Sequence, residues 1–390
     1  MEIVLIKNIG MILSGDIKEP VAMGNSIRLQ GKRIEAIGND LSADGAVQII
    51  NANGTTVMPG LFDSHVHTTL GDFAPRQKTM DYISSALHGG VTSMISAGEC
   101  HTPGRPTDPA GTKALALLAS KSFYKAPPAG VKVHGGALIL EKGLTEEDFA
   151  ELKEQGVWLV GEIGLGSVKD PEEAAVMTTW AHKYGFKVQM HTGGTSIPGS
   201  STVRAEDVRR VRPDVVSHIN GGPTSISLTE IDSIMEEDDA TFAFEIVQCG
   251  NPKAARHVFT KAIAEKKLDR IIFGNDAPSG TGLIPLGILR NICFASSVCD
   301  IDPAEAVCMA TGNTASVYGL ETGIVAPGKE ADLVILDAPM GSVAETAAEA
   351  FAAGDIPGIH MVLINGKIVV QKSRNTPPPK RSAILENKRG

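Results

Sequence analysis

The stretch PGLFDSHVH, residues 59–67, decides the fold, because an apolar, strand-like run leads directly into polar side chains. The run begins at Thr56 and ends on two histidines, His65 and His67. Residues two apart on an extended strand project to the same side, so both imidazoles face one direction. We therefore expect a strand over residues 56–67 whose carboxyl end carries chemistry.

The same pattern recurs along the middle of the chain, where each apolar run is followed by a helix-compatible stretch. Eight such runs occur, at residues 56–67, 91–97, 131–139, 157–162, 186–191, 215–218, 242–247 and 270–275. Such runs are typical of parallel strands that are covered on both faces, and eight of them alternating with helices predict a (β/α)8 TIM barrel. An open, doubly wound α/β sheet is the structural alternative. The count of eight and the lack of a Gly-x-Gly-x-x-Gly turn after the first strand favour the barrel, which we place at residues 58–321.

Short alternating strands flank the predicted barrel on both sides. They lie at residues 2–7, 26–29, 34–37 and 55–58 before it, and at 331–337 and 360–370 after it. The last of these reads as a hairpin around Asn365-Gly366. Neither flanking segment is long enough to bury a core of its own. We predict that residues 1–57 and 322–390 form one composite small β-sandwich domain, and that the basic end at 380–389 is a solvated tail.

Composition excludes several classes of function. The 390-residue chain has a formal net charge of −9, which argues against a nucleic-acid partner because phosphates would be repelled. No apolar run approaches the roughly 18 residues of a membrane span, and the first residues show no signal peptide. The five cysteines contain no Cys-x-x-Cys pair and give no disulfide framework. We therefore expect a cytoplasmic protein without a membrane or nucleic-acid partner.

Polar side chains gather where the predicted barrel strands end. In (β/α)8 enzymes the chemistry lies at these carboxyl ends, so side chains from different strands can share one site. A lone histidine at a strand end is usually structural, but five strand ends in order supply His-x-His, Glu, His, His and Asp. Four imidazoles with two carboxylates suit divalent metals such as zinc or iron. The predicted metal ligands are His65, His67, Glu162, His191, His218 and Asp276.

This arrangement resembles the amidohydrolase superfamily. Residues 59–67 look like the motif that opens its barrel, and the stretch GKEADL at 328–333 is similar to its return into the β domain. The resemblance implies a hydrolase with two divalent metal ions, Zn and/or Fe. It also implies a homo-oligomer, with a tetramer as one candidate.

The resemblance further implies a role for each ligand. His65, His67 and Asp276 would hold one ion, and His191 and His218 the other. Many relatives bridge the two ions with a carboxylated lysine on the fourth strand, where this chain has Glu162. Asp276 would also be catalytic, taking a proton from the attacking water and returning it to the departing nitrogen.

Two further motifs are similar to the enamidases within this superfamily: HTGGTSIPG at 191–199 and FGNDAPSG at 273–280. Enamidases open the lactam 6-oxo-1,4,5,6-tetrahydronicotinate to 2-formylglutarate with release of ammonia in nicotinate degradation. The implied substrate is a small cyclic amide that carries a carboxylate. Its predicted contacts are the cations Arg76, Lys78 and Arg290, the loop residues Gly194 and Thr195, and His134 in the third strand.

Other interpretations stay open, because fold and site do not choose the ring that is hydrolysed. A cyclic amidohydrolase of the dihydropyrimidinase, hydantoinase or dihydroorotase type would use the same centre, as would a phosphotriesterase or lactonase. A deaminase of the superfamily keeps one metal and has a glutamate three residues after the fifth-strand histidine, where this chain has Gly194. A non-catalytic scaffold relative would have lost ligands, whereas all six are present here.

Overall fold

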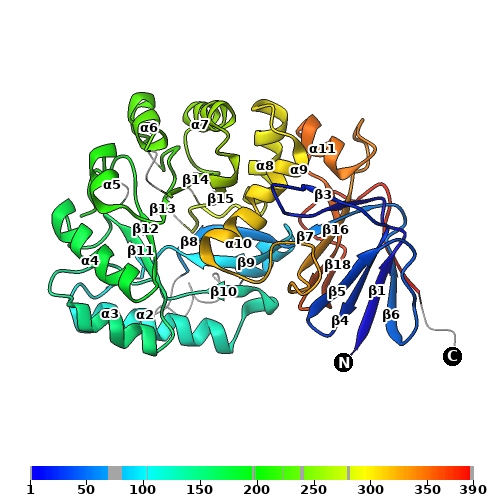
Figure 1. The fold of residues 1–390 in the computed structure, drawn as a ribbon, viewed down its shortest axis with the longest axis horizontal. Helices are drawn as coiled ribbons and strands as arrows, with labels where there is room; N and C mark the ends of the chain where they lie inside the picture. Colours follow the sequence, from blue (N-terminus) through cyan, green and yellow to red (C-terminus); the bar gives the residue numbers. More distant parts are fainter. Residues whose placement is uncertain are drawn as a thin grey trace.

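Two parallel sheets form the middle of the molecule (Figure 1). The computed structural model describes residues 2–68, 81–102, 104–195, 197, 199–222, 224–237, 241–278 and 282–386. One sheet holds β8 (Leu61–Val66), β9 (Val91–Ser96) and β10 (Lys132–His134). The other holds, in chain order, β11 (Leu159–Ile163), β12 (Lys187–Met190), β13 (Val215–Val216), β14 (Ala243–Val247) and β15 (Ile271–Gly274).

Single bridges join these two sheets at both edges. Leu138, which follows β10, bridges Val160 of β11, and Val66 of β8 bridges Ala277, which follows β15. At the second seam, the His67 N–H donates to the Ala277 carbonyl at 3.0 Å. The eight parallel strands of the described residues therefore follow one another around a closed (β/α)8 barrel, which confirms the predicted fold class.

Helices cover the outside of the strands (Figure 1). The described helices around the barrel include α2 (Pro109–Lys125), α3 (Glu146–Glu154), α4 (Pro171–Lys183), α5 (Ala205–Val211), α6 (Leu228–Met235), α7 (Pro252–Glu265), α8 (Gly287–Val298), α9 (Pro303–Met309) and α10 (Gly312–Tyr318), with 3-10 turns η1 (Pro128–Gly130) and η2 (Leu268–Arg270). Residues 81–87 are helical as well. None of the described helices is long and apolar enough to cross a membrane.

Four of these helices begin with the same local signal. Asp108, Asp170, Asn251 and Asp302 each accept a hydrogen bond from a first-turn backbone N–H and precede a proline. The side chain satisfies a backbone donor that the helix leaves unpaired, and proline at the first helical position loses no helical hydrogen bond. The chain thus marks where the preceding connections end and helices α2, α4, α7 and α9 begin.

The remaining strands build two sheets beside the barrel (Figure 1). Their orders are β19-β6-β1-β4-β5 and β18-β17-β16-β7-β2-β3. The strands are β1 (Ile3–Lys7), β2 (Met11–Leu13), β3 (Val21–Ala22), β4 (Ser26–Gln30), β5 (Arg33–Gly38), β6 (Ala46–Asn51), β7 (Thr56–Pro59), β16 (Leu333–Asp337), β17 (Gly358–Ile364), β18 (Lys367–Gln371) and β19 (Ile384–Glu386), with helix α11 (Ala347–Ala353) between β16 and β17.

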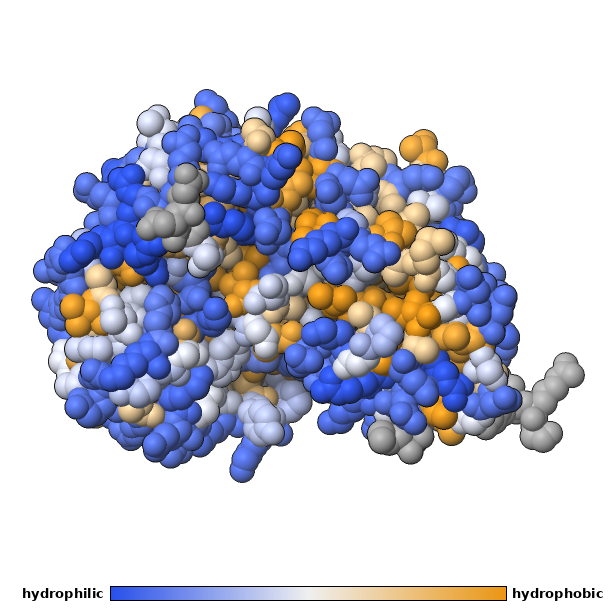
Figure 2. Space-filling view, in the orientation of Figure 1, coloured by the Kyte–Doolittle hydropathy of each residue, from blue (hydrophilic) through white to orange (hydrophobic). Residues whose placement is uncertain are grey.

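The two sheets pack their apolar faces together. Ile6 and Ile27 from one sheet and Val57, Leu333 and Ile335 from the other belong to one buried cluster. Strands from both flanking segments therefore share one core, which confirms the composite β-sandwich. The exact division at residues 57/58 and 321/322 stays a prediction. Figure 2 shows mostly hydrophilic residues over the barrel helices on this face, with apolar residues gathered where the barrel meets the sandwich.

Two differences from the sequence expectation concern the first predicted barrel strand and the basic C-terminal end. The predicted strand over residues 56–67 is two strands, because β7 pairs with β16 in the sandwich and β8 begins the barrel. Gly60 separates them, and a Cβ there would lie 2.1 Å from the Thr92 hydroxyl oxygen. The predicted tail is in part bound: β19 pairs with β6, and the Arg381 guanidinium donates to both carboxylate oxygens of Asp337 at 2.7 and 2.8 Å.

Candidate metal centre

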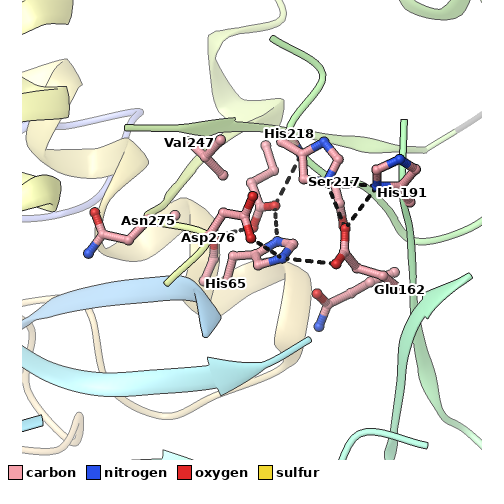
Figure 3. Close-up of polar contacts among 12 residues, drawn as sticks. His65, Glu162, His191, Ser217, His218, Val247, Asn275 and Asp276 are labelled. Carbon is pink, nitrogen blue, oxygen red and sulfur yellow. Dashed lines mark hydrogen bonds and ion pairs between the residues drawn. The ribbon is translucent and has the colours of Figure 1, made fainter. Parts of the chain in front are cut away.

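The six side chains predicted as metal ligands lie together at the carboxyl ends of the barrel strands, and Figure 3 labels all of them except His67. His65 lies near the end of β8 and His67 directly follows that strand, while β11 carries Glu162. The remaining three, His191, His218 and Asp276, follow β12, β13 and β15 within two residues. Glu162 lies between two groups of nitrogens, so its two oxygens face different partners.

The first group contains the Nε2 atoms of His65 and His67, which are 3.2 Å apart. Glu162 Oε2 lies 3.3 Å from the first and 3.4 Å from the second. Asp276 Oδ1 lies 3.6 and 3.3 Å from the same two nitrogens. Donors around a tetrahedral zinc ion, each about 2.0–2.1 Å from the metal, stand about 3.3 Å apart, so these four atoms have the spacing of one ligand set.

The second group contains His191 and His218. His191 Nδ1 and His218 Nε2 are 3.2 Å apart. The other oxygen of Glu162, Oε1, lies 2.7 Å from His218 Nε2 and 3.7 Å from His191 Nδ1. The carboxylate of Glu162 therefore joins the two groups, one oxygen to each.

In three of the histidines, the ring nitrogen that faces away from the cluster makes a hydrogen bond that fixes the tautomer of the imidazole. His67 Nδ1 donates to the Gly98 carbonyl at 2.9 Å, and His191 Nε2 donates to the Gly194 carbonyl at 2.8 Å. His65 Nδ1 donates to the Glu245 carboxylate at 2.7 Å. Carbonyls and carboxylates only accept, so each of these nitrogens carries the proton and the other nitrogen presents a lone pair to Glu162 or Asp276.

Lone pairs and carboxylates at this spacing repel one another unless positive charge lies between them. Without a cation the cluster holds protons: burial lowers the pKa of His65, but Glu245 and Glu162 raise it well above its ordinary value. Burial likewise raises the pKa of Glu162, yet the charges of His65 and His218 hold it well below the usual range. Metal ions displace such protons when they bind, so the donor set fits divalent cations.

Comparison with known proteins agrees with this geometry. Residues 56–369 match the amidohydrolase family. The chain belongs to the amidohydrolase family. Members of this family generally use metal ions. In this chain the ligand atoms of His65, His67 and Asp276 lie within 4.8 Å of one another, and so do those of His65, Glu162 and His218.

Several amidohydrolase relatives are similar over long spans. The enamidase of Eubacterium barkeri is 67% identical over 383 residues, which cover 98% of this chain and 99% of that protein. A crystal structure of enamidase, presented as a new member of the amidohydrolase superfamily, has a TM-score of 0.95 at 66% identity and covers 99% of this chain and 100% of that one. The adenine deaminase of Ruegeria sp. (strain TM1040) is 27% identical over 81% of this chain, which spans only 51% of that protein.

Glu245 on β14 is a residue of this amidohydrolase site that the sequence analysis did not single out. It is fully buried and accepts hydrogen bonds from the Ser64 hydroxyl at 2.5 Å, His65 Nδ1 at 2.7 Å and the His218 backbone N–H at 3.2 Å. It thus contacts one histidine of each ligand group. The sequence does contain a signal for Glu245, since the apolar run AFEIV places a glutamate inside a buried strand. A buried carboxylate needs fixed hydrogen-bond partners, so such a glutamate is a candidate for a structural role beside the site.

Asp276 is the ligand candidate that solvent reaches. Its side chain is 13% exposed, whereas that of Glu162 is 3% exposed. Its Oδ2 lies 3.6 Å from Cys249 Sγ, and a Cβ on Gly222 would come within 3.3 Å of the same oxygen. The open side of the amidohydrolase centre is therefore at Asp276.

The loop after His191 is held by its own hydrogen bonds. The Gly194 N–H donates to the Thr224 hydroxyl at 3.1 Å, and its carbonyl accepts from His191. The structure therefore shows Gly194 orienting His191, while a contact of Gly194 or the exposed Thr195 with substrate stays a prediction.

Of the other predicted substrate contacts, His134 does not lie at the ligand cluster, and contacts of the remaining ones with substrate stay predictions. His134 packs edge-on against Trp158, with ring centroids 5.6 Å apart, and lines a pocket of about 510 Å³ beside α2. Burial lowers the pKa of His134 to about 4, so its ring is neutral. Arg290 is exposed on α8. Arg76 and Lys78 lie outside the described residues.

Proposed function

We propose that this amidohydrolase opens a small cyclic amide at a two-metal centre, with 6-oxo-1,4,5,6-tetrahydronicotinate as substrate and 2-formylglutarate and ammonia as products. The observation that carries the proposal is the position of Glu162, with one oxygen against each of two histidine groups. Near full-length identity of 67% to the enamidase of Eubacterium barkeri supports the choice of ring.

Two divalent ions, Zn and/or Fe, fit the residues. His65, His67 and Asp276 would hold one ion, His191 and His218 the other, and Glu162 would contact both. When bound, such ions polarise the amide carbonyl and lower the pKa of water to near ~7, which supplies the nucleophile at neutral pH.

Asp276 would move the proton. Burial raises its pKa, but hydrogen bonding to His67 and the charge of His65 hold it well below the usual range, so the carboxylate is ionised at neutral pH. It accepts a proton from water as the water oxygen bonds to the carbonyl carbon. It then donates that proton to the ring nitrogen as the C–N bond breaks. The enamine released tautomerises to an imine, which a second water converts to the aldehyde and ammonia.

A deaminase is the weaker alternative at this site. It would need a glutamate at position 194, where this chain has glycine. A Cβ at Gly194 would lie 2.1 Å from the Thr224 hydroxyl oxygen, so Thr224 would have to move before any side chain fitted there. The loop is therefore shaped for glycine.

The remaining parts of the proposal concern the surroundings of the site. A cation near the mouth would pair with the substrate carboxylate, and Arg76, Lys78 and Arg290 remain the predicted candidates. A cytoplasmic location agrees with the five cysteines, none of which forms a disulfide. A homo-oligomer such as a tetramer is the proposed assembly.

Metal analysis combined with a substrate panel tests the proposed function. Purified protein should contain close to two metal ions per chain and should consume 6-oxo-1,4,5,6-tetrahydronicotinate faster than dihydropyrimidines or hydantoins, followed spectrophotometrically. A single ion per chain would favour the deaminase alternative. Good turnover of another ring without turnover of the lactam would exclude the enamidase assignment.

Glu245 gives a second prediction. Glu245→Gln leaves one acceptor oxygen for three donors, so either His65 or Ser64 loses its fixed partner. We expect metal affinity to fall by about 10–100-fold, the usual effect of removing a hydrogen bond that orients a metal-binding histidine. Competition with a chelator measures this directly, and circular dichroism checks that the barrel is intact. Unchanged affinity would show that packing alone orients His65.

A further inference from the structure

Two further candidate ligands, Cys100 and His101, lie beside the His67 ring, with Cys100 on the side that faces away from Glu162 and Asp276. Cys100 Sγ is 3.3 Å from His67 Nδ1, the ring nitrogen that faces away from Glu162 and Asp276. The rings of His67 and His101 stand edge to face with centroids 5.1 Å apart. The ligand atoms of His67, Cys100 and His101 all lie within 4.8 Å of one another.

We infer that His67, Cys100 and His101 form a further binding site for a soft divalent cation, such as cadmium or excess zinc, and that this site shares His67 with the proposed catalytic centre. A zinc ion about 2.3 Å from sulfur and about 2.0 Å from nitrogen holds these atoms about 3.5 Å apart, close to the observed 3.3 Å. Thiolate ligands select soft cations, whereas the ligands of the proposed catalytic centre are nitrogens and oxygens. The two sites should therefore differ in metal preference.

Occupation of this site should inhibit the enzyme. The cation would bind the sulfur of Cys100 and Nδ1 of His67, and the two protons that these atoms carry would pass to solvent. The hydrogen bond from His67 Nδ1 to the Gly98 carbonyl, 2.9 Å long, would be lost. His67 would then carry a cation on each ring nitrogen and would be drawn toward Cys100, away from Asp276.

The inference rests on the proposed two-metal centre only where it says that cadmium binding inhibits the enzyme. Cadmium binding at Cys100 itself does not depend on that centre. A cadmium–thiolate bond gives an ultraviolet charge-transfer absorption, which reports Cys100 whatever substrate the enzyme uses. Failure of lactam turnover would leave this signal in place. Failure of the signal would leave the lactam result in place.

The experiment titrates the metal-loaded full chain with cadmium and follows three quantities: bound cadmium by equilibrium dialysis, thiolate absorption, and turnover. We expect absorption to rise with an additional bound ion while turnover falls. Cys100→Ser should abolish the absorption, and both Cys100→Ser and His101→Asn should need at least about tenfold more cadmium for half-inhibition, each compared with its own turnover before cadmium is added.

Cys249→Ser is the matched control. Cys249 lies 3.6 Å from Asp276, so its thiol would report cadmium that had entered the catalytic centre instead. The proposal requires the absorption to persist in this variant. It is overturned if the wild type shows no thiolate absorption, if the absorption survives in Cys100→Ser, or if it disappears in Cys249→Ser.

Discussion

Asp276→Asn should lower turnover of the lactam by at least ~10², the scale of losing a positioned general acid–base group. The amide keeps an oxygen that can face His67, and the other five ligand candidates remain, so metal content should stay close to that of the wild type. What the amide cannot do is take a proton from water and return it to the ring nitrogen. Steady-state turnover and elemental analysis of the same preparation separate the two effects.

Asp232→Asn serves as the control for this prediction. Asp232 lies on α6 and pairs with His257 at 2.7 Å, away from the ligand cluster. Its replacement should leave turnover within a few fold of the wild type. If Asp276→Asn turned over the lactam at a comparable rate, proton transfer would have to be assigned to another group.

Glu162→Gln should remove one ion from the centre and lower turnover by a factor comparable to that of Asp276→Asn. Only one of its two oxygens would remain, and the new NH2 group would point at nitrogens or at a cation, where it cannot act as a ligand. His191 and His218 would then be the only predicted protein ligands of the second ion. The metal content measured by elemental analysis should fall toward one ion per chain, and added zinc should restore only a small part of the turnover.

Glu99→Gln is a matched control, because Glu99 is also a buried carboxylate near the carboxyl end of a barrel strand, β9. It accepts from the Ser96 hydroxyl at 3.2 Å, and burial raises its pKa to about 7, so a neutral amide imitates it well. We expect its metal content to equal that of the wild type. If Glu162→Gln also retained both ions, Glu162 would not be the bridge.

Much of the fold could be predicted because each barrel strand coincides with an apolar run in the sequence. Each of the eight runs contains a strand, although β10 stops at His134, before Gly135-Gly136, and β13 is only Val215–Val216. Strands β2, β3, β6 and β19 were not predicted. β2, β3 and β19 are only two or three residues long, and all four strands owe their conformation to sheet partners elsewhere in the chain, which local pattern does not reveal.

The ligand set could be predicted because each member closes a strand, and parallel strands of a barrel deliver their carboxyl ends to one face. Glu245 could not, since it lies inside a strand and its partners His65 and Ser64 are far away in sequence. His134 shows the converse limit: it closes β10, yet its ring packs on Trp158. A residue at the end of a barrel strand can reach the site, but the three-dimensional packing decides whether its side chain points there.

The sandwich has a consequence for how the protein is made. β7 lies between β2 and β16, and its residue Val57 pairs with Ile335. A ribosome must therefore translate the whole barrel before β7 can meet this partner, which takes on the order of tens of seconds at about 5–20 residues per second. During that interval the edge of β7 that pairs with β16 has unpaired backbone N–H and C=O groups, which are available to other chains. The barrel can begin to fold during translation, whereas the sandwich must wait for its C-terminal strands, and this is the stage at which a chaperone would have most to protect.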